Sequence, residues 1–290
     1  MCRLRRTHIS QADMLYGAQD TALNYKEYRY CTQAVSREGV SEQKPIISCN
    51  KSCIGIYNMD KMIVYEDKNI MVIHKPAGIA TQTGRLGQAD LVSELKNYRK
   101  KKGEDTYIGV VHRLDQPVEG LLVFAKDAKS AKILTNQLGT KVLNKSYSAI
   151  VSVENDTELT GGKLRDYLLK DNRTNTSSVV SEEKPIPKEA KEAVLYWEIV
   201  QKCGNAALIK VKLLTGRHHQ IRVQMSNAGM PLLGDIKYGS EFSKKLSKQL
   251  NIKNTALLAD SIEFEHPLTG KKMSFNIDNG SMLSKIVVKI

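Results

Sequence analysis

From Met62 onward the chain is a succession of short apolar runs, rich in Val, Ile and Leu, that are separated by turn-forming residues. Runs of this kind predict β-strands. Several connections, such as 66–69 and 266–270, have only a few residues, whereas a parallel crossover needs about a dozen or more. The sequence therefore predicts an α+β fold with a mostly antiparallel mixed central sheet and flanking helices and loops. The expected strands are residues 62–65, 70–73, 108–111, 121–125, 146–153, 193–199, 206–214, 257–264 and 272–277.

Two helices are predicted from capping residues followed by apolar residues at helical spacing. The first pattern begins at Asp90 and ends in a basic stretch and Gly103, and the second begins at Asp127 and ends at Gly139. An aspartate at the N-cap position accepts hydrogen bonds from backbone N–H groups that have no partner within the helix. Both segments should therefore be amphipathic helices beside the sheet.

A third helix is expected late in the chain, from residue 216 or 217 to 228, with Thr215 as its N-cap. Residues 154–189, by contrast, are polar, and we expect them to form a surface excursion. The third helix should face the core through Ile221, Met225 and Ala228, which recur at the spacing of one helix face.

The first part of the chain differs from the rest. Residues 1–60 show no sustained helical or strand period, so we interpret them as an N-terminal extension without a recognisable motif, followed by one domain over residues 61–290. The extension holds four of the five cysteines, and this uneven distribution argues against a disulfide framework. Cys49 and Cys53 have no matching second pair, so we predict free thiols and no metal site.

The charge balance predicts a polyanionic partner. The 290 residues include 44 Lys and Arg against 31 Asp and Glu, a formal net charge of +13, and nucleic acid is the commonest cytoplasmic polyanion. No apolar run approaches the roughly 18 residues that a membrane-spanning helix needs. Polar residues follow the first arginines where a signal peptide would be apolar. We therefore expect a cytoplasmic protein with no membrane segment.

Several common enzyme motifs are absent from the sequence. It has no GxxxxGK[ST] or GxGxxG loop, no HExxH or deaminase zinc signature, and no GxSxG nucleophile elbow. One carboxylate is better placed for chemistry, because Asp115 lies in a polar loop between two expected strands. A guanidinium aimed at it would keep it ionised and oriented, as a nucleophile or base requires. A purely structural pair between Asp115 and an arginine would explain the same residues.

Four segments, in order along the chain, resemble the signature of the RluA-type pseudouridine synthases. They match the family's opening KPxG segment, its HRLD loop with the following GLLLxAK strand, its KxYxA strand, and its TGRxHQIR and GDxxYG block. The resemblance extends over about residues 62–290. The segments are YED with VIHKPAG at 65–78, GVVHRLD with GLLVFAK at 109–126, NKSYSA at 144–149, and LTGRHHQIR with GDIKYG at 214–239.

The resemblance implies roles for individual residues. Asp115 matches the family's catalytic aspartate, Tyr147 the aromatic residue that packs on the target uracil, and Arg222 the salt-bridge partner of the aspartate. Arg113 matches the position that fills the base stack when a nucleotide is flipped out. The catalytic set is thus Asp115, Tyr147 and Arg222, and the set expected to bind substrate RNA is His112, Arg113, Arg217, His219 and Gln220.

The resemblance also implies a pseudouridine synthase catalytic domain over residues 61–290 and an isomerase reaction. The family breaks the C1′–N1 bond of a uridine and rejoins the uracil through C5, with no cofactor or metal. The partner would be ribosomal or transfer RNA, and we expect a monomer. Two other interpretations remain: a non-catalytic RNA-binding or ribosome-assembly protein on the same fold, and an RNA N-glycosylase that releases free uracil.

One departure from the family pattern lies beside the aspartate. The chain has Val118 and Glu119 where the family usually has Thr-Ser, which places a second carboxylate near Asp115. We expect Glu119 to point to solvent. Some relatives carry an additional N-terminal RNA-binding module, and none is recognisable in residues 1–60.

Overall fold

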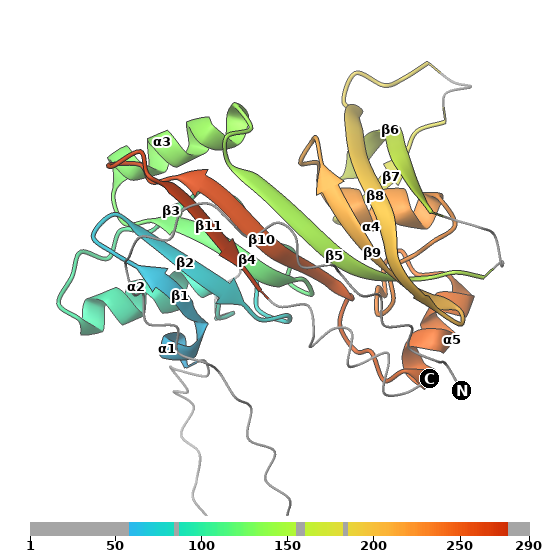
Figure 1. Ribbon diagram of the computed structural model, residues 1–290, viewed down its shortest axis with the longest axis horizontal. Helices are drawn as coiled ribbons and strands as arrows, with labels where there is room; N and C mark the ends of the chain where they lie inside the picture. Colours follow the sequence, from blue (N-terminus) through green and yellow to red (C-terminus); the bar gives the residue numbers. More distant parts are fainter. Residues whose placement is uncertain (1–57, 84–86, 155–159, 182–184, 278–290) are drawn as a thin grey trace, which may run out of the picture. The chain divides into compact units, whose positions relative to one another are not determined.

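A single mixed sheet organises the part of the chain that the computed structural model describes, namely residues 58–83, 87–154, 160–181 and 185–277 (Figure 1). Its strands are β1 (Ile63–Glu66), β2 (Ile70–Lys75), β3 (Gly109–Val110), β4 (Glu119–Ala125), β5 (Asn144–Ser152), β6 (Gly161–Asp171), β7 (Thr176–Val179), β8 (Lys191–Cys203), β9 (Ala206–Leu213), β10 (Leu257–Glu265) and β11 (Lys272–Asn276).

The strand order confirms the predicted fold class. Neighbouring strands run β1-β2-β4-β10-β5-β9-β8-β6-β7, while β3 also pairs with β4 and β11 with β10. All of these pairings are antiparallel except that of β10 with β4, which is parallel. The β1–β2 and β10–β11 hairpins follow the short connections seen in the sequence, and the sheet is mixed but mostly antiparallel.

Five helices accompany the sheet in the described ranges: α1 (Met59–Met62), α2 (Leu91–Lys101), α3 (Ala128–Gly139), α4 (Gln220–Asn227) and α5 (Glu241–Gln249). The predicted caps of α2 and α3 are confirmed, because the side chains of Asp90 and Asp127 accept hydrogen bonds from the backbone N–H groups of Ser93 and Ser130. Within these ranges no helix has the length and apolar character needed to span a membrane.

The helices cover both faces of the sheet. Tyr147 and Ala149 on β5 belong to a core cluster that also contains Leu95 of α2 and Met225 of α4. Ile150, the next residue along β5, belongs instead to a cluster with residues at the end of α5. Successive side chains of a strand point to opposite faces. Tyr147 therefore lies on the face covered by α2 and α4, and Ile150 on the opposite face.

The structure differs from the sequence prediction in residues 154–189. This segment includes β6, which pairs with β8 over residues 161–168, and β7, which pairs with β6. Most side chains of β6 are exposed or only partly buried, so the strand carries little of the apolar alternation by which a half-buried strand is recognised. Part of the segment that was expected to be a surface excursion therefore extends the sheet.

The late helices also differ from expectation. Helix α4 begins at Gln220 with His219 at its N-cap position, and Thr215 instead hydrogen-bonds to the Gln220 side chain and to β8. Ile221 and Met225 are buried as expected, but Ala228 is exposed. Helix α5 was not predicted, because its most buried residues are Ser243 and Ser247, which give no apolar signal.

Candidate active site

The loop between β3 and β4 carries Asp115 and is held at both ends. Thr81 donates from its hydroxyl to the Leu114 carbonyl and accepts from the Leu114 N–H. After the loop, Gly120 has a φ of 141°, and a Cβ at this position would lie 2.5 Å from backbone atoms of Ala259 on β10. Only glycine allows this close approach of β4 to β10. The loop therefore presents Asp115 from a fixed base.

Arg222, on the first turns of α4, holds Asp115 together with a second carboxylate. Its Nη1 donates to Asp115 Oδ2 at 3.0 Å, while its Nε and Nη2 donate to the two oxygens of Asp235 at 2.7 and 2.8 Å. The paired geometry with Asp235 is that of a bidentate, charge-assisted contact. Burial by itself would raise the pKa of Asp235, but the contacts with Arg222 outweigh it, and the pKa lies below its usual value.

The predicted pair between Asp115 and Arg222 is therefore present in the structure. Both Arg222 Nη1 and His219 Nε2, at 3.0 and 3.5 Å, approach the same oxygen of Asp115, Oδ2. Within the described ranges no donor contacts the other oxygen, Oδ1. Among the described residues, one oxygen of the carboxylate is thus held by two side chains and the other has no protein donor.

Tyr147 lies beside Asp115, on the β5 strand. Its side chain is buried, with 5% of its surface exposed, and it lines the same small cavity as Asp115. Burial, and to a smaller extent the charge of Asp115, raises the pKa of Tyr147, so its phenol keeps its proton at neutral pH. The ring therefore offers an uncharged aromatic surface and one hydroxyl group.

The cavity brings together residues from loops, sheet and helix that are far apart in the sequence. Its volume is about 80 Å³. It joins the Asp115 loop, β5 and the segment that leads into α4. The lining residues are Arg113, Leu114, Asp115, Val118, Tyr147, Leu213, Arg217, His219, Gln220, Ile221, Arg222 and Leu257.

The residues expected to bind RNA fall into two groups. Arg113 and Arg217 are exposed at the cavity. Gln220 lines the same cavity but is buried, and its side chain bonds to Thr215, to the backbone N–H of Arg217 and to β8. His112 is buried too, and its Nε2 accepts the Val123 N–H. Burial lowers the pKa of His112 well below its usual value. The structure thus places the side chains of His112 and Gln220 inside the fold, and their contact with RNA stays a prediction.

Three residues at the site, of which Lys75 and Asp235 are buried and Tyr238 is partly buried, were noted in the sequence only as parts of motifs. Asp235 and Tyr238 support Arg222, whose guanidinium carbon lies 5.0 Å from the centre of the Tyr238 ring. Lys75, fully buried below the loop, donates to the carbonyls of Pro76, Ile79 and Gln116. Burial lowers the pKa of Lys75 to about 8, opposed by the charge of Asp115. Asp235, Tyr238 and Lys75 each lie in a motif segment, but the sequence did not predict the contacts that they make.

Glu119 does not simply point to solvent as expected. Its carboxylate lies 2.9 Å from Nε2 of His74 on the neighbouring strand β2, and about one third of its side chain is exposed. Val118, the residue before it, is buried in the core cluster of Tyr147, so Glu119 projects from the opposite face of the sheet. The second carboxylate is therefore turned away from the Asp115 cavity.

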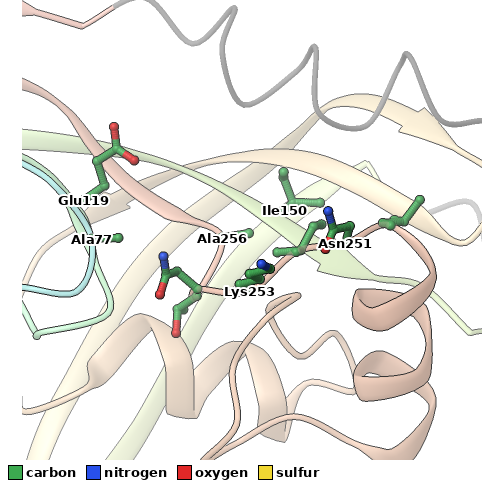
Figure 2. A pocket seen from close by; sticks show the side chains of 10 residues that line it. Ala77, Glu119, Ile150, Asn251, Lys253 and Ala256 are labelled. Carbon is green, nitrogen blue, oxygen red and sulfur yellow. The ribbon is translucent and has the colours of Figure 1, made fainter. Parts of the chain in front are cut away.

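A larger cavity, of about 370 Å³, lies on that opposite face. Figure 2 shows Glu119 and Ala77 on one side of it, opposite Ile150 and Asn251. It is lined mainly by the segment between α5 and β10. No described group of three or more His, Cys, Asp or Glu could hold a metal ion in either cavity, and Cys49 and Cys53 lie outside the described residues.

The fold is similar to that of proteins of a known class. The structure is similar to that of "Human RNA Pseudouridylate Synthase Domain Containing 4", with a TM-score of 0.63 and 22% identity over 79% of this chain and 94% of that chain. It is also similar to "Human RNA Pseudouridylate Synthase Domain Containing 1", with a TM-score of 0.58 and 19% identity over 74% of this chain and 82% of that chain. The fold is therefore that of the pseudouridine synthases, as predicted.

Sequence comparison gives the family. The family model described as RNA pseudouridylate synthase matches residues 69–227. "Ribosomal large subunit pseudouridine synthase C" of Haemophilus influenzae is 30% identical over 80% of this chain and 69% of its own length. "Uncharacterized RNA pseudouridine synthase YhcT" of Bacillus subtilis is 35% identical over 71% of this chain and 65% of its own length. The chain belongs to the RNA pseudouridylate synthase family, and is an isomerase.

Proposed function

We propose that this RNA pseudouridine synthase uses Asp115 to isomerise specific uridines in the RNA of the large ribosomal subunit. The choice of RNA rests on the relatives, since "Ribosomal large subunit pseudouridine synthase C" from several bacteria matches about four fifths of the chain. The sequence by itself left ribosomal and transfer RNA open. The surplus of positive charge in the chain suits either polyanion.

The single observation that carries the catalytic role is the arrangement around the Asp115 carboxylate. Arg222 and His219 approach Oδ2, and Oδ1 has no donor among the described residues and belongs to a cavity-lining side chain. Both chemical routes considered for this family begin at such an oxygen, either by attack on C1′ or by removal of a proton from the sugar. Arg222 would orient the carboxylate and balance its charge.

Tyr147 and the exposed arginines complete the proposed site. A uridine must leave its base stack to reach Asp115, and stacking on an aromatic ring contributes ~1–3 kcal/mol per base. The Tyr147 ring supplies that surface, and Arg113 and Arg217 are placed to contact the RNA at the cavity. The net reaction breaks the C1′–N1 bond and forms a C1′–C5 bond. The hydrogen lost from C5 is balanced by the one gained at N1, so the mass of the RNA does not change.

The proposed domain organisation assigns this activity to residues 61–290, with residues 1–60 as an extension. The family match over residues 69–227 supports a catalytic segment within that range. Residues 1–57 lie outside the described part of the chain, so the role of the extension stays a prediction. The monomeric state and the cytoplasmic location also stay predictions.

The test is a map of pseudouridine in RNA, made by carbodiimide modification and primer extension on RNA from cells with and without this gene. We expect the loss of one or more pseudouridines in large-subunit ribosomal RNA, and their return when the wild-type gene, but not Asp115→Asn, is restored. A site lost from transfer RNA alone would refute the proposed substrate. Release of free uracil would indicate an N-glycosylase, and binding of RNA without conversion would indicate the non-catalytic alternative.

A further inference from the structure

A chain of polar contacts leads from a strand at the edge of the sheet to Asp115. The backbone N–H of Ser177, on β7, donates to the hydroxyl oxygen of Tyr238 at 2.9 Å. That hydroxyl lies 2.6 Å from Nδ1 of His219. On the other side of the imidazole, Nε2 of His219 lies 3.5 Å from Oδ2 of Asp115. The three contacts connect a backbone amide of β7 to the proposed catalytic carboxylate.

The donors in this chain can be assigned from its two ends. A backbone amide only donates, so the Tyr238 oxygen accepts from Ser177 and has its own hydrogen available for His219. At the other end, a carboxylate oxygen only accepts, so a favourable contact at 3.5 Å needs the hydrogen on His219 Nε2. Both ends favour the same arrangement, in which Nδ1 of His219 accepts from Tyr238 and Nε2 carries the proton.

The charges around His219 favour its neutral form. Burial lowers its pKa to about 4, and Asp115 opposes this shift, while Arg222, His218 and Lys237 contribute to it. His218 is stacked on His219 with ring centres 3.7 Å apart, and its own Nδ1 is 2.9 Å from the Ser177 hydroxyl. The Tyr238 ring meets the His219 ring edge-on. The imidazole is thus fixed by contacts on its faces as well as at both nitrogens.

We infer that His219 is a positioning residue for Asp115, acting as the neutral tautomer with its proton on Nε2, and that Tyr238 and the Ser177 amide fix this tautomer. The inference rests on the proposed role of Asp115. His219 was expected from the sequence to bind RNA, and its backbone φ of 54° is a conformation that non-glycine residues rarely adopt. This conformation, at the start of α4, places the ring between Tyr238 and Asp115.

The inference gives Tyr238 two positioning roles. Its ring packs against the Arg222 guanidinium, and its hydroxyl orients His219, so one residue supports both groups that approach Oδ2 of Asp115. Asp115 then has its Oδ2 oriented from two directions, which leaves Oδ1 for the substrate. Fixing a reactive group in this way lowers the barrier without adding a new chemical step. It also makes the pairing of β7 with β6 part of the support of the site.

The tautomer can be measured directly and without RNA. In full-length protein labelled with 15N-histidine, two-bond proton–nitrogen spectra at pH 7.5 distinguish protonated from unprotonated ring nitrogens, and His219→Gln assigns the signal. We expect a protonated Nε2 and an unprotonated Nδ1 in the wild type, and a detectable share of the other tautomer in Tyr238→Phe. A proton on Nδ1 in the wild type would overturn the inference, and an unchanged tautomer in Tyr238→Phe would overturn the role of Tyr238.

A kinetic cycle tests the consequence for catalysis with a transcript of large-subunit ribosomal RNA. We expect Tyr238→Phe to lower kcat about tenfold with KM within about twofold, because a misoriented group affects the reaction step more than binding. In the His219→Gln background, where an amide donor has no tautomers to fix, the same change should alter kcat by less than about twofold. An equal loss in both backgrounds would refute the coupling.

A matched control is Tyr196→Phe, since Tyr196 is 44% exposed on β8 and no hydrogen bond of its hydroxyl is found in the described residues. This variant should keep wild-type kcat, and a tenfold loss in it would overturn the specific assignment to Tyr238. Failure of this inference can be distinguished from failure of the proposed function. A wild type that converts no uridine in this RNA would refute the proposed substrate, whereas the tautomer measurement depends only on the folded protein.

Discussion

Arg222 contacts two carboxylates, and the structure predicts that removing the charge of each has a different effect on stability. Asp235 is buried, with 1% of its side chain exposed, and forms two hydrogen bonds with Arg222. Asp115 has 30% of its side chain exposed and forms one. Removing one partner of a buried ion pair leaves the other uncompensated, at a cost of ~3–5 kcal/mol. A more exposed pair contributes only ~0–1 kcal/mol.

The expected result is that Asp235→Asn unfolds much more easily than Asp115→Asn. At ~2–4 °C per kcal/mol for a domain of this size, Asp235→Asn should lower the Tm by ~6–20 °C and Asp115→Asn by at most ~4 °C. Calorimetry of the two variants beside the wild type gives the comparison. Isomerisation by Asp115→Asn, measured as tritium release from RNA labelled at C5 of uridine, should be below about one thousandth of wild type.

Two results would refute this reasoning. If Asp115→Asn lowered the Tm as much as Asp235→Asn, Asp115 would be a structural residue of the same kind. If Asp115→Asn still converted uridine at a substantial rate, the proposed chemistry at Oδ1 would be wrong. RNA binding by Asp115→Asn is the control, and it should equal or slightly exceed that of the wild type, because a carboxylate repels phosphates.

Three further predictions concern the whole chain. RNA affinity should fall steeply with salt, by ~0.7–0.9 log units per log unit of salt for each phosphate neutralised, and affinity that is constant between low and moderate salt would contradict an RNA substrate. A chain beginning near Asp60 should fold and still isomerise uridine, with or without a zinc chelator, and loss of folding would show that residues before Asp60 pack on the domain. Stability should also fall below about pH 6.5, because burial lowers the pKa of His112 and only the unfolded chain takes up that proton. In His112→Gln, whose amide oxygen can accept the Val123 N–H, urea unfolding should show ~1–2 kcal/mol less loss of stability between pH 7 and pH 5, and an unchanged pH dependence would contradict the burial of a neutral His112.

The fold could be predicted from the sequence where local signals and burial agree. The segment from Asp127 through α3 combines a cap with an apolar face, and β4 is a continuous apolar run, so both were found. Strand β6 and helix α5 were missed because the first is mostly exposed and the second buries serines. In both cases the stabilising contacts are with distant parts of the chain, and no local pattern records them.

For the candidate site, the sequence predicted a set of residues but not the contacts that surround each of them. Asp115 and Arg222 were paired because of the resemblance, and the structure places them in contact. His112 and His219 had the same expected role, but one is buried under β4 and the other lies against Asp115. Which histidine faces the cavity depends on strand register and on the backbone conformation at residue 219, and a motif specifies neither.

The parallel pairing of β4 with β10 has a consequence for how the enzyme is made. Glu119 and Gly120, directly after the Asp115 loop, pair with Leu258 and Ala259, which the ribosome adds much later. At ~5–20 residues per second, the Asp115 loop is synthesised roughly 7–30 s before the strand that lies beside it. Arg222, the partner of Asp115, lies 107 residues further along the chain and is also synthesised later. We therefore expect a nascent chain to be inactive until β10 has been synthesised, and no N-terminal fragment ending before β10 should convert uridine.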